Sequence, residues 1–364
     1  MQQVRRALKA ALACVAVMGM SLGETPRIPL VKDLTIVRAW RGGAAQGDYE
    51  GTIRVDAVDA QSVTLISSGA GVEIDTRMSR ATMRDARIYR EVWTTADPEV
   101  IAGATSMTVS SALLNELATK GVTKMTIIPN TGTGKSGSML DQMSSISKAV
   151  FSDSTSTGTP YTGTLRRVES GTVPFALLIN GHPATVTAIH ASGKVVAEGD
   201  AMDIELYILD DPALPIVLAS GAVGGEGGRV IKITYPDSTA TSELERALAS
   251  KQPAEIYDIY FDYNAATITP QSERALHDIG EILRRHADWK LEIVGHTDSI
   301  GGSGTGNATL SAARATAVRN ALAGRDGIAA GRLTTHGAGG SQPIATNITL
   351  DGRAKNRRVE IRRL

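Results

Sequence analysis

The sequence lacks the features that mark several large classes of protein. Its 364 residues include a single cysteine, Cys14, which excludes an internal disulfide framework and a zinc site built from cysteines. Lysine and arginine total 38 and aspartate and glutamate total 38, so the formal net charge is zero. That balance argues against a nucleic-acid binder that depends on neutralising phosphates. After residue 23, no apolar run approaches the roughly 20 residues that a membrane-spanning helix needs, so we expect no transmembrane segment in the mature chain.

The first 23 residues predict a cleaved signal peptide. Arg5, Arg6 and Lys9 precede an apolar run over 10–22, and small residues at 21 and 23 favour cleavage before Glu24. The run is too short for a membrane span but suits the hydrophobic region of a secretory signal. We therefore expect the mature protein in the periplasm.

Cleavage at this point would also remove Cys14, leaving a mature chain without cysteine. Lipidation of Cys14 is not expected, because few apolar residues separate it from the cations and the apolar run continues well beyond it.

Two regions of different composition and hydrophobic pattern follow, and together they predict an α+β protein. Residues 24–240 are rich in β-branched runs separated by turn-forming residues, which indicates a mainly β periplasmic region of one or two lobes with a break near 152–160. Asn180-Gly181 predicts a tight hairpin, and Ser110 and Gly121 bracket a short predicted helix. Residues 241–253 are expected to form a linker helix, with Ser242 and Glu245 spaced as a capping box.

Residues 254–364 alternate strands and helices and predict a β-α-β-α-β-β sandwich. The expected strands cover 255–263, 290–297, 332–337 and 357–363, and the expected helices cover 270–286 and 310–322. Apolar residues at helical spacing in the first of these helices indicate that one face packs on the sheet.

The chemistry concentrates where the second of these strands ends. Gly295-His296-Thr297-Asp298 places a carboxylate at the sheet edge before a glycine-rich loop, and Arg314 follows in the next helix. With a helix beginning near residue 310, Arg314 would lie in its first turns, where the helix dipole disfavours a cation unless it serves an anion. Asp298 and Arg314 together match a zwitterion, with an ammonium on the aspartate and a carboxylate on the arginine. The alternative is that the two residues form a salt bridge with each other.

Five segments of this region resemble, in order, the OmpA/Pal/MotB-type C-terminal peptidoglycan-associating domain. The segments are IYFDYNAATITPQSERAL (259–276), LEIVGHTDSIG (291–301), NATLSAARATAVRNAL (307–322), GRLTTHGAGGSQPIATN (331–347) and GRAKNRRVEIR (352–362). The resemblance covers about a third of the chain and implies an OmpA-like fold over 254–364. It leaves residues 24–240 without a recognised family.

The resemblance implies a noncatalytic protein, without cofactor or metal, that binds the diaminopimelate of the peptidoglycan stem peptide. Such a protein would tether the outer membrane or an envelope assembly to the cell wall. The loop at 299–306 is one residue longer than the usual family spacing and is rich in glycine. We expect this more flexible loop to affect the affinity for peptidoglycan. The ligand positions of the family fall on Asp298 and Arg314, the pocket-lining positions on Thr297, Asn307 and Leu310, and the adjacent NRR motif on Asn356, Arg357 and Arg358.

Two alternatives from other classes stay open. Residues 24–240 could form a wall-tethered periplasmic enzyme, although no set of catalytic residues can be named there. In the noncatalytic interpretation, the same residues could contact an envelope protein partner. A channel or stator component would need an uncleaved anchor. Residues 251–364 carry 15 basic and 12 acidic side chains, and this small positive excess suits an anionic wall polymer and not nucleic acid.

Overall fold

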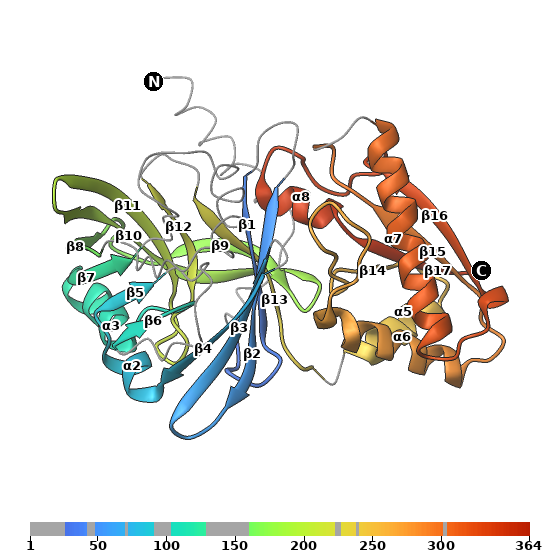
Figure 1. Cartoon of the computed structure of the whole chain (residues 1–364), viewed down its shortest axis with the longest axis horizontal. Helices are drawn as coiled ribbons and strands as arrows, with labels where there is room; N and C mark the ends of the chain where they lie inside the picture. The colour runs from blue at the N-terminus through green and yellow to red at the C-terminus, as the bar shows by residue number, and fades with distance from the viewer. Residues whose placement is uncertain are drawn as a thin grey trace.

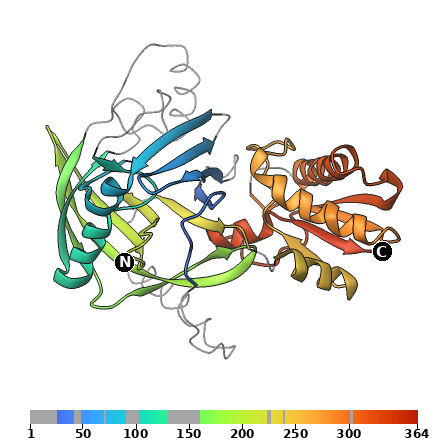
Figure 2. The ribbon, with the colours of Figure 1, turned by 90° about the horizontal axis from the view of Figure 1, so that it is seen from below.

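The computed structural model describes residues 26–41, 48–69, 72–90, 103–128, 160–222, 227–237, 240–300 and 304–364. The predicted signal peptide, Cys14 and most of the predicted break near 152–160 lie outside these ranges. The described residues form a 13-stranded sheet in the N-terminal region and a four-stranded sheet in the C-terminal region, and the two regions lie side by side (Figures 1 and 2). The mixed α+β class is confirmed.

The described part of the N-terminal region contains thirteen strands and two short helices. Its helices are α2 (Arg80–Asp85) and α3 (Ser111–Lys120). Its strands are β1 (Thr35–Trp40), β2 (Tyr49–Val58), β3 (Ser62–Gly69), β4 (Val72–Ser79), β5 (Ile88–Arg90), β6 (Ala104–Thr105), β7 (Val122–Ile128), β8 (Tyr161–Arg167), β9 (Val173–Ile179), β10 (His182–Ala197), β11 (Asp200–Leu209), β12 (Val217–Ala222) and β13 (Gly228–Thr234).

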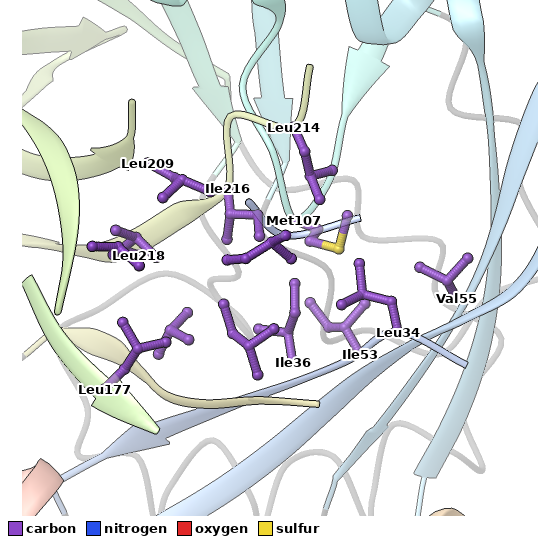
Figure 3. Packing of buried hydrophobic residues seen from close by; sticks show 14 of the residues in the cluster. Leu34, Ile36, Ile53, Val55, Met107, Leu177, Leu209, Leu214, Ile216 and Leu218 are labelled. Atoms are coloured by element: carbon purple, nitrogen blue, oxygen red, sulfur yellow. The ribbon is translucent and has the colours of Figure 1, made fainter. Parts of the chain in front are cut away.

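The large sheet runs β4-β3-β2-β1-β13-β12-β11-β10-β8-β7-β5-β6, and β9 pairs with both β10 and β13. Most neighbours are antiparallel, and the sheet curves around its own apolar side chains. Figure 3 shows this packing. Leu34, which directly precedes β1, and Ile36 of β1 lie against residues from β2, β9 and β12. A second cluster lies under α3, whose Leu113, Leu114 and Leu117 pack on β7, β8 and β10.

Local signals in this region specify the observed turns and caps. The predicted hairpin is confirmed, because Asn180 and Gly181 have φ values of 46° and 80° between the paired strands β9 and β10. Ser110 accepts a hydrogen bond from the Leu113 amide at 3.2 Å, and Gly121 ends α3 in the left-handed conformation with φ of 69°.

The C-terminal sheet has the order β14-β17-β15-β16, with β15 and β16 parallel and the other pairs antiparallel. The apolar faces of α6 and α7 pack with the sheet around Leu291 and Ile293. No helix within the described ranges is long and apolar enough to cross a membrane. The elements are α5 (Ala240–Ala249), β14 (Ala254–Ile256), the 3-10 turn η1 (Pro270–Ser272), α6 (Glu273–Arg285), β15 (Leu291–His296), α7 (Gly304–Gly324), the 3-10 turn η2 (Ala330–Arg332), β16 (Leu333–Gly339), α8 (Leu350–Asn356) and β17 (Val359–Arg363).

Three expected boundaries were wrong. Helix α5 begins before Ser242, so Ser242 lies inside the helix and the predicted capping box does not start it. The strand expected over 255–263 ends at Ile256, and Phe261 instead forms an isolated antiparallel bridge with Ile268 across the turn at Asn264, whose φ is 51°. Helix α7 begins at Gly304 and not near residue 310, which places Arg314 in the middle of the helix and away from its N-terminal amides.

Helix α8 was not predicted. It lies between β16 and β17, where the expected β-α-β-α-β-β order has no helix, and it carries most of the GRAKNRR segment. Thr349 caps it by accepting a hydrogen bond from the Gly352 amide at 3.2 Å. The helix also contacts β13 of the N-terminal region, so it joins the two regions.

An apolar cluster fills the junction between the two regions. Val37, Ala39 and Ile231 of β1 and β13 pack with Tyr260 and Ala354 of the C-terminal region, and all five are buried. Leu248 of α5, within the predicted linker, packs in the C-terminal core. The N-terminal sheet therefore rests directly on the C-terminal region.

Two glycines let α7 approach the C-terminal sheet closely. A β-carbon on Gly295 of β15 would lie 2.1 Å from the Ser311 carbonyl oxygen, and one on Gly337 of β16 would lie 2.6 Å from the Ala312 amide nitrogen. Neither helix backbone atom can move aside without shifting α7. This close approach sets the position of every α7 side chain that faces the end of β15.

We predict that Gly295→Ala lowers the free energy of unfolding by about 1–3 kcal/mol or more, because the added methyl group forces α7 away from β15. Denaturant unfolding of the variant and the wild type measures the change. Gly331→Ala is the matched control, since a β-carbon there meets nothing within 4 Å. Equal stability of the Gly295 variant and the control would contradict the close-approach argument.

Candidate functional site

A pocket of about 110 Å³ opens where β15 ends, between the two regions of the chain. Its C-terminal wall includes every predicted site residue except Asn356, and its other wall comes from β2 and β13. The side chains used below are Asp48, Glu50, Lys232, Phe261, Tyr263, Thr297, Asp298, Asn307, Leu310, Arg314, Arg357 and Arg358.

Asp298 lies at the base of the pocket and is 4% exposed. Its Oδ1 accepts a hydrogen bond from the Ile300 amide at 2.8 Å, which fixes the turn after β15. Its Oδ2 accepts a hydrogen bond from Nη1 of Arg357. The hydroxyl of the preceding Thr297 is buried and has no hydrogen-bond partner within the part of the chain that the structure describes. A bound molecule could satisfy that hydroxyl.

Arg314 reaches the pocket from the middle of α7. Its Nε donates a hydrogen bond to the Ala265 carbonyl at 2.9 Å, and its guanidinium lies 4.9 Å from the centre of the Phe261 ring. Burial lowers the pKa of Arg314 to about 10, so the side chain is cationic at neutral pH. Among the described residues, Asp298 pairs with Arg357 and not with Arg314, so the alternative of a direct salt bridge is not the arrangement observed.

Asn307 and Leu310 lie on the same face of α7 as Arg314 and complete this wall. The Asn307 side-chain amide donates to the Asp298 carbonyl oxygen at 3.3 Å, which ties the helix to the end of β15. Arg358 also reaches the pocket and lies 3.6 Å from a carboxylate oxygen of Glu360.

Asn356 has a different place. It is fully buried, and its Oδ1 accepts hydrogen bonds from the Ile344 and Ala345 amides at 2.9 and 3.0 Å. Its Nδ2 donates to Oδ1 of Asn347 at 2.9 Å, and that same oxygen accepts from the Ser299 amide at 3.2 Å. Asn356 therefore positions the loops that flank the pocket and does not line it.

The opposite wall was not predicted from the sequence. Asp48 and Glu50, at the start of β2, and Lys232 of β13 face the C-terminal arginines. Glu50 accepts hydrogen bonds from Nε of Arg357 at 2.9 Å and from its Nη2, and Asp48 accepts from its Nη1 at 3.2 Å. No motif surrounds these three residues, so only their charge could have drawn attention to them.

Asp48 also holds the buried arginine of α8. Arg353 is 1% exposed and donates to both Asp48 carboxylate oxygens, from Nε at 2.7 Å and from Nη2 at 2.8 Å. Its remaining Nη1 donates to the Asn347 and Ile348 carbonyls at 2.9 Å each. Bidentate pairing of this kind is favourable only with good geometry, which the two parallel contacts supply.

The charges around the pocket are strongly coupled. Burial alone would raise the pKa of Glu50, but Arg357 and Lys232 outweigh burial and lower that pKa to about 2. Burial lowers the pKa of Lys232, although Glu50 opposes the shift. The carboxylates raise the pKa of Arg357 despite its burial. The pocket is thus lined by ionised groups of both signs, an environment that suits a zwitterionic ligand.

The side chains of the pocket offer charged and neutral groups that can bind a ligand. Within the described ranges, no three histidine, cysteine, aspartate or glutamate side chains lie close enough together to hold a metal ion. Asp298 and Arg314 can each make charge-assisted hydrogen bonds, while Thr297 can add a neutral one.

We predict that Glu50→Gln lowers the free energy of unfolding by about 1–3 kcal/mol at pH 7, because it removes a charged partner of Arg357. The folded-state pKa of Glu50 is about 2 and its ordinary value is 4.5, so this contribution is complete above pH 4.5 and is lost as the pH falls toward 2. Denaturant unfolding at several pH values measures the difference between the two proteins.

The control for this series is Glu73→Gln, which neutralises an exposed carboxylate of β4 and is expected to leave stability nearly unchanged. A difference between wild type and Glu50→Gln that stays constant from pH 7 to about pH 3 would contradict the assigned pairing.

Comparison with known proteins identifies the C-terminal region. The family model described as "OmpA family" matches residues 260–357. Outer membrane porin F of Pseudomonas fluorescens is 39% identical over 103 residues, which are 28% of this chain and 31% of that protein. Peptidoglycan-binding protein ArfA of Mycobacterium bovis is 41% identical over 103 residues, again 28% of this chain and 31% of that protein. The match therefore spans about a third of the length of these curated relatives.

A solved structure of the peptidoglycan-associated lipoprotein from Burkholderia pseudomallei is also similar. It is 27% identical, covers 29% of this chain and 88% of its own, and has a TM-score of 0.27. The residues that the OmpA family model matches include five that line the pocket, namely Thr297, Asp298, Asn307, Leu310 and Arg314. Residues 260–357 of this chain form a domain of the OmpA family.

Proposed function

We propose that this protein is a noncatalytic component of the cell envelope that binds peptidoglycan through the diaminopimelate of the stem peptide. In this proposal the ligand's ammonium group lies on Asp298, its carboxylate lies on Arg314, and Thr297, Asn307 and Leu310 surround it. Arg357 and Arg358 border the same site, and Asn356 holds the flanking loops.

The observation that carries the proposal is the separation of two opposite charges, a buried carboxylate and a half-buried guanidinium, in one pocket. Asp298 comes from the end of β15 and Arg314 from the middle of α7, and among the described residues they do not pair with each other. The free end of diaminopimelate bears an ammonium and a carboxylate on one carbon, so it presents both charges within a few ångströms. The unpartnered Thr297 hydroxyl adds a place for a further hydrogen bond.

The same relatives support a proposal for where the protein acts. One is named as an outer membrane porin and another as a peptidoglycan-binding protein, and Asp298 and Arg314 lie in the segment that the OmpA family model matches. We propose that the chain is exported by a signal peptide over 1–23 and lies in the periplasm at the outer membrane. Residues 254–364 then hold the wall, and residues 24–240 connect it to the outer membrane or to an envelope assembly.

We predict that the double variant Asp298→Ala/Arg314→Ala loses co-sedimentation with diaminopimelate-containing sacculi. Removal of two charge-assisted contacts, each contributing about 1.5–3 kcal/mol, corresponds to a loss of affinity of at least a hundredfold. The measurement is the fraction of full-length protein bound across a concentration series of sacculi.

Arg319→Ala is the matched control, because Arg319 lies on the same helix but does not line the pocket. Far-ultraviolet circular dichroism should match among the wild type and both variants. Undiminished binding by the folded double variant would refute the assigned site.

A further inference from the structure

The N-terminal region places a carboxylate on the cations of the pocket. Glu50 contacts Arg357 through two of its nitrogens, and Asp48 and Asp298 contact Nη1 of the same guanidinium. An arginine has five N–H donors, and these carboxylates engage all three of its nitrogens. A ligand carboxylate that approaches Arg357 therefore meets an acceptor already in place.

Glu50 also acts on the other cation. Glu50 and Arg314 line the same pocket, and the negative charge of Glu50 opposes the lowering of the pKa of Arg314 by burial. The same charge disfavours the approach of a second carboxylate. Because the surroundings are largely buried, solvent screens this repulsion weakly.

The side chain next to Glu50 in the sequence covers a pocket residue as well. Tyr49 stacks on Tyr263, a pocket residue, with ring centres 4.8 Å apart. With the N-terminal region in this position, Asp298 is 4% exposed and Asn307 is 8% exposed. A ligand that contacts either side chain must therefore displace, or fit beside, the residues that cover it.

The contacts that hold this cover are of two kinds. One is the apolar cluster around Tyr260 and Ala354, which has no charge to change. The other is the set of ion pairs that Asp48 and Glu50 make with Arg353 and Arg357. The second kind places carboxylates on Arg357, a cation of the same pocket as Arg314, so a ligand carboxylate that enters the pocket competes with Glu50 for its positive charge.

We propose that Glu50 is an internal competitor of the ligand carboxylate for the cations of the pocket. The β-rich region then closes the pocket, and binding to the wall requires Glu50 to be released from Arg357. The inference rests on the proposed function for the identity of the ligand. It makes the N-terminal region a regulator of wall attachment in addition to a connector. It also assigns to β2 a role that comparison of the C-terminal domain alone does not reveal.

The test compares full-length wild type, Glu50→Gln and Glu73→Gln. Affinity for a soluble muropeptide, a disaccharide bearing a diaminopimelate-containing tetrapeptide, is measured by calorimetry. Hydrogen exchange of the amides of residues 297–300 reports opening of the pocket in the absence of ligand. We expect Glu50→Gln to bind about tenfold more tightly, to exchange faster at these amides, and to keep the overall fold, while Glu73→Gln matches the wild type.

The outcomes separate the two proposals. Equal or weaker muropeptide binding by Glu50→Gln would overturn the competitor role, and weaker binding would make Glu50 a ligand contact instead. Unchanged exchange at residues 297–300 would show that Glu50 does not hold the pocket closed, whatever the affinity. If exchange rises but neither protein binds the muropeptide, the proposed ligand is wrong and the competitor role fails with it, whereas closure by Glu50 stands.

Discussion

The guanidinium of Arg357, whose side chain is only 16% exposed, is the constraint on which the site depends. A cation removed from water must be paired, and the pairing must use most of its donors. Asp298 from the end of β15 and Asp48 and Glu50 from the start of β2 meet this requirement together. One side chain thus ties the C-terminal sheet, the loop after α8 and the N-terminal sheet into a single arrangement.

The neighbouring arginine extends this arrangement into the body of the protein. Arg353 is fully buried and is satisfied by Asp48 and by two carbonyls of the loop before α8. A buried ion pair of this kind specifies geometry more than it adds stability, because desolvation offsets much of the attraction. The apolar cluster beside it, around Tyr260 and Ala354, supplies stabilisation by burial. Ion pairs therefore set how the two regions meet, and apolar packing holds them there.

The sequence carries clear local information where a short segment determines its own structure. Asn180-Gly181 predicts its hairpin, and Ser110 and Gly121 predict both ends of α3, because turn and cap geometry depend on a few adjacent residues. The early start of α7 at Gly304 could not be predicted in this way, since glycine-rich sequence normally opposes helix. Helix α8 was also missed, because its seven residues bury Arg353 and Ala354 against partners distant in the sequence.

The candidate site shows the same contrast between residues that a sequence pattern identifies and residues that only tertiary packing brings together. Asp298, Thr297, Asn307, Leu310 and Arg314 could be named because a family pattern spans them, and the structure brings all five to one pocket. Asn356 belongs to the same pattern but supports loops. Asp48, Glu50 and Lys232 could not be named, because they reach the pocket only through the packing of one region on the other, which no local pattern records.

We propose above all that the pocket holds diaminopimelate between Asp298 and Arg314, in competition with the N-terminal region. A crystal structure of the full-length chain bound to a diaminopimelate-containing muropeptide tests this claim most directly. We predict that the ligand ammonium lies within hydrogen-bond distance of Asp298, that its carboxylate lies on Arg314, and that Glu50 is displaced from Arg357. A ligand bound elsewhere, or bound in this pocket with Glu50 still on Arg357, would contradict it.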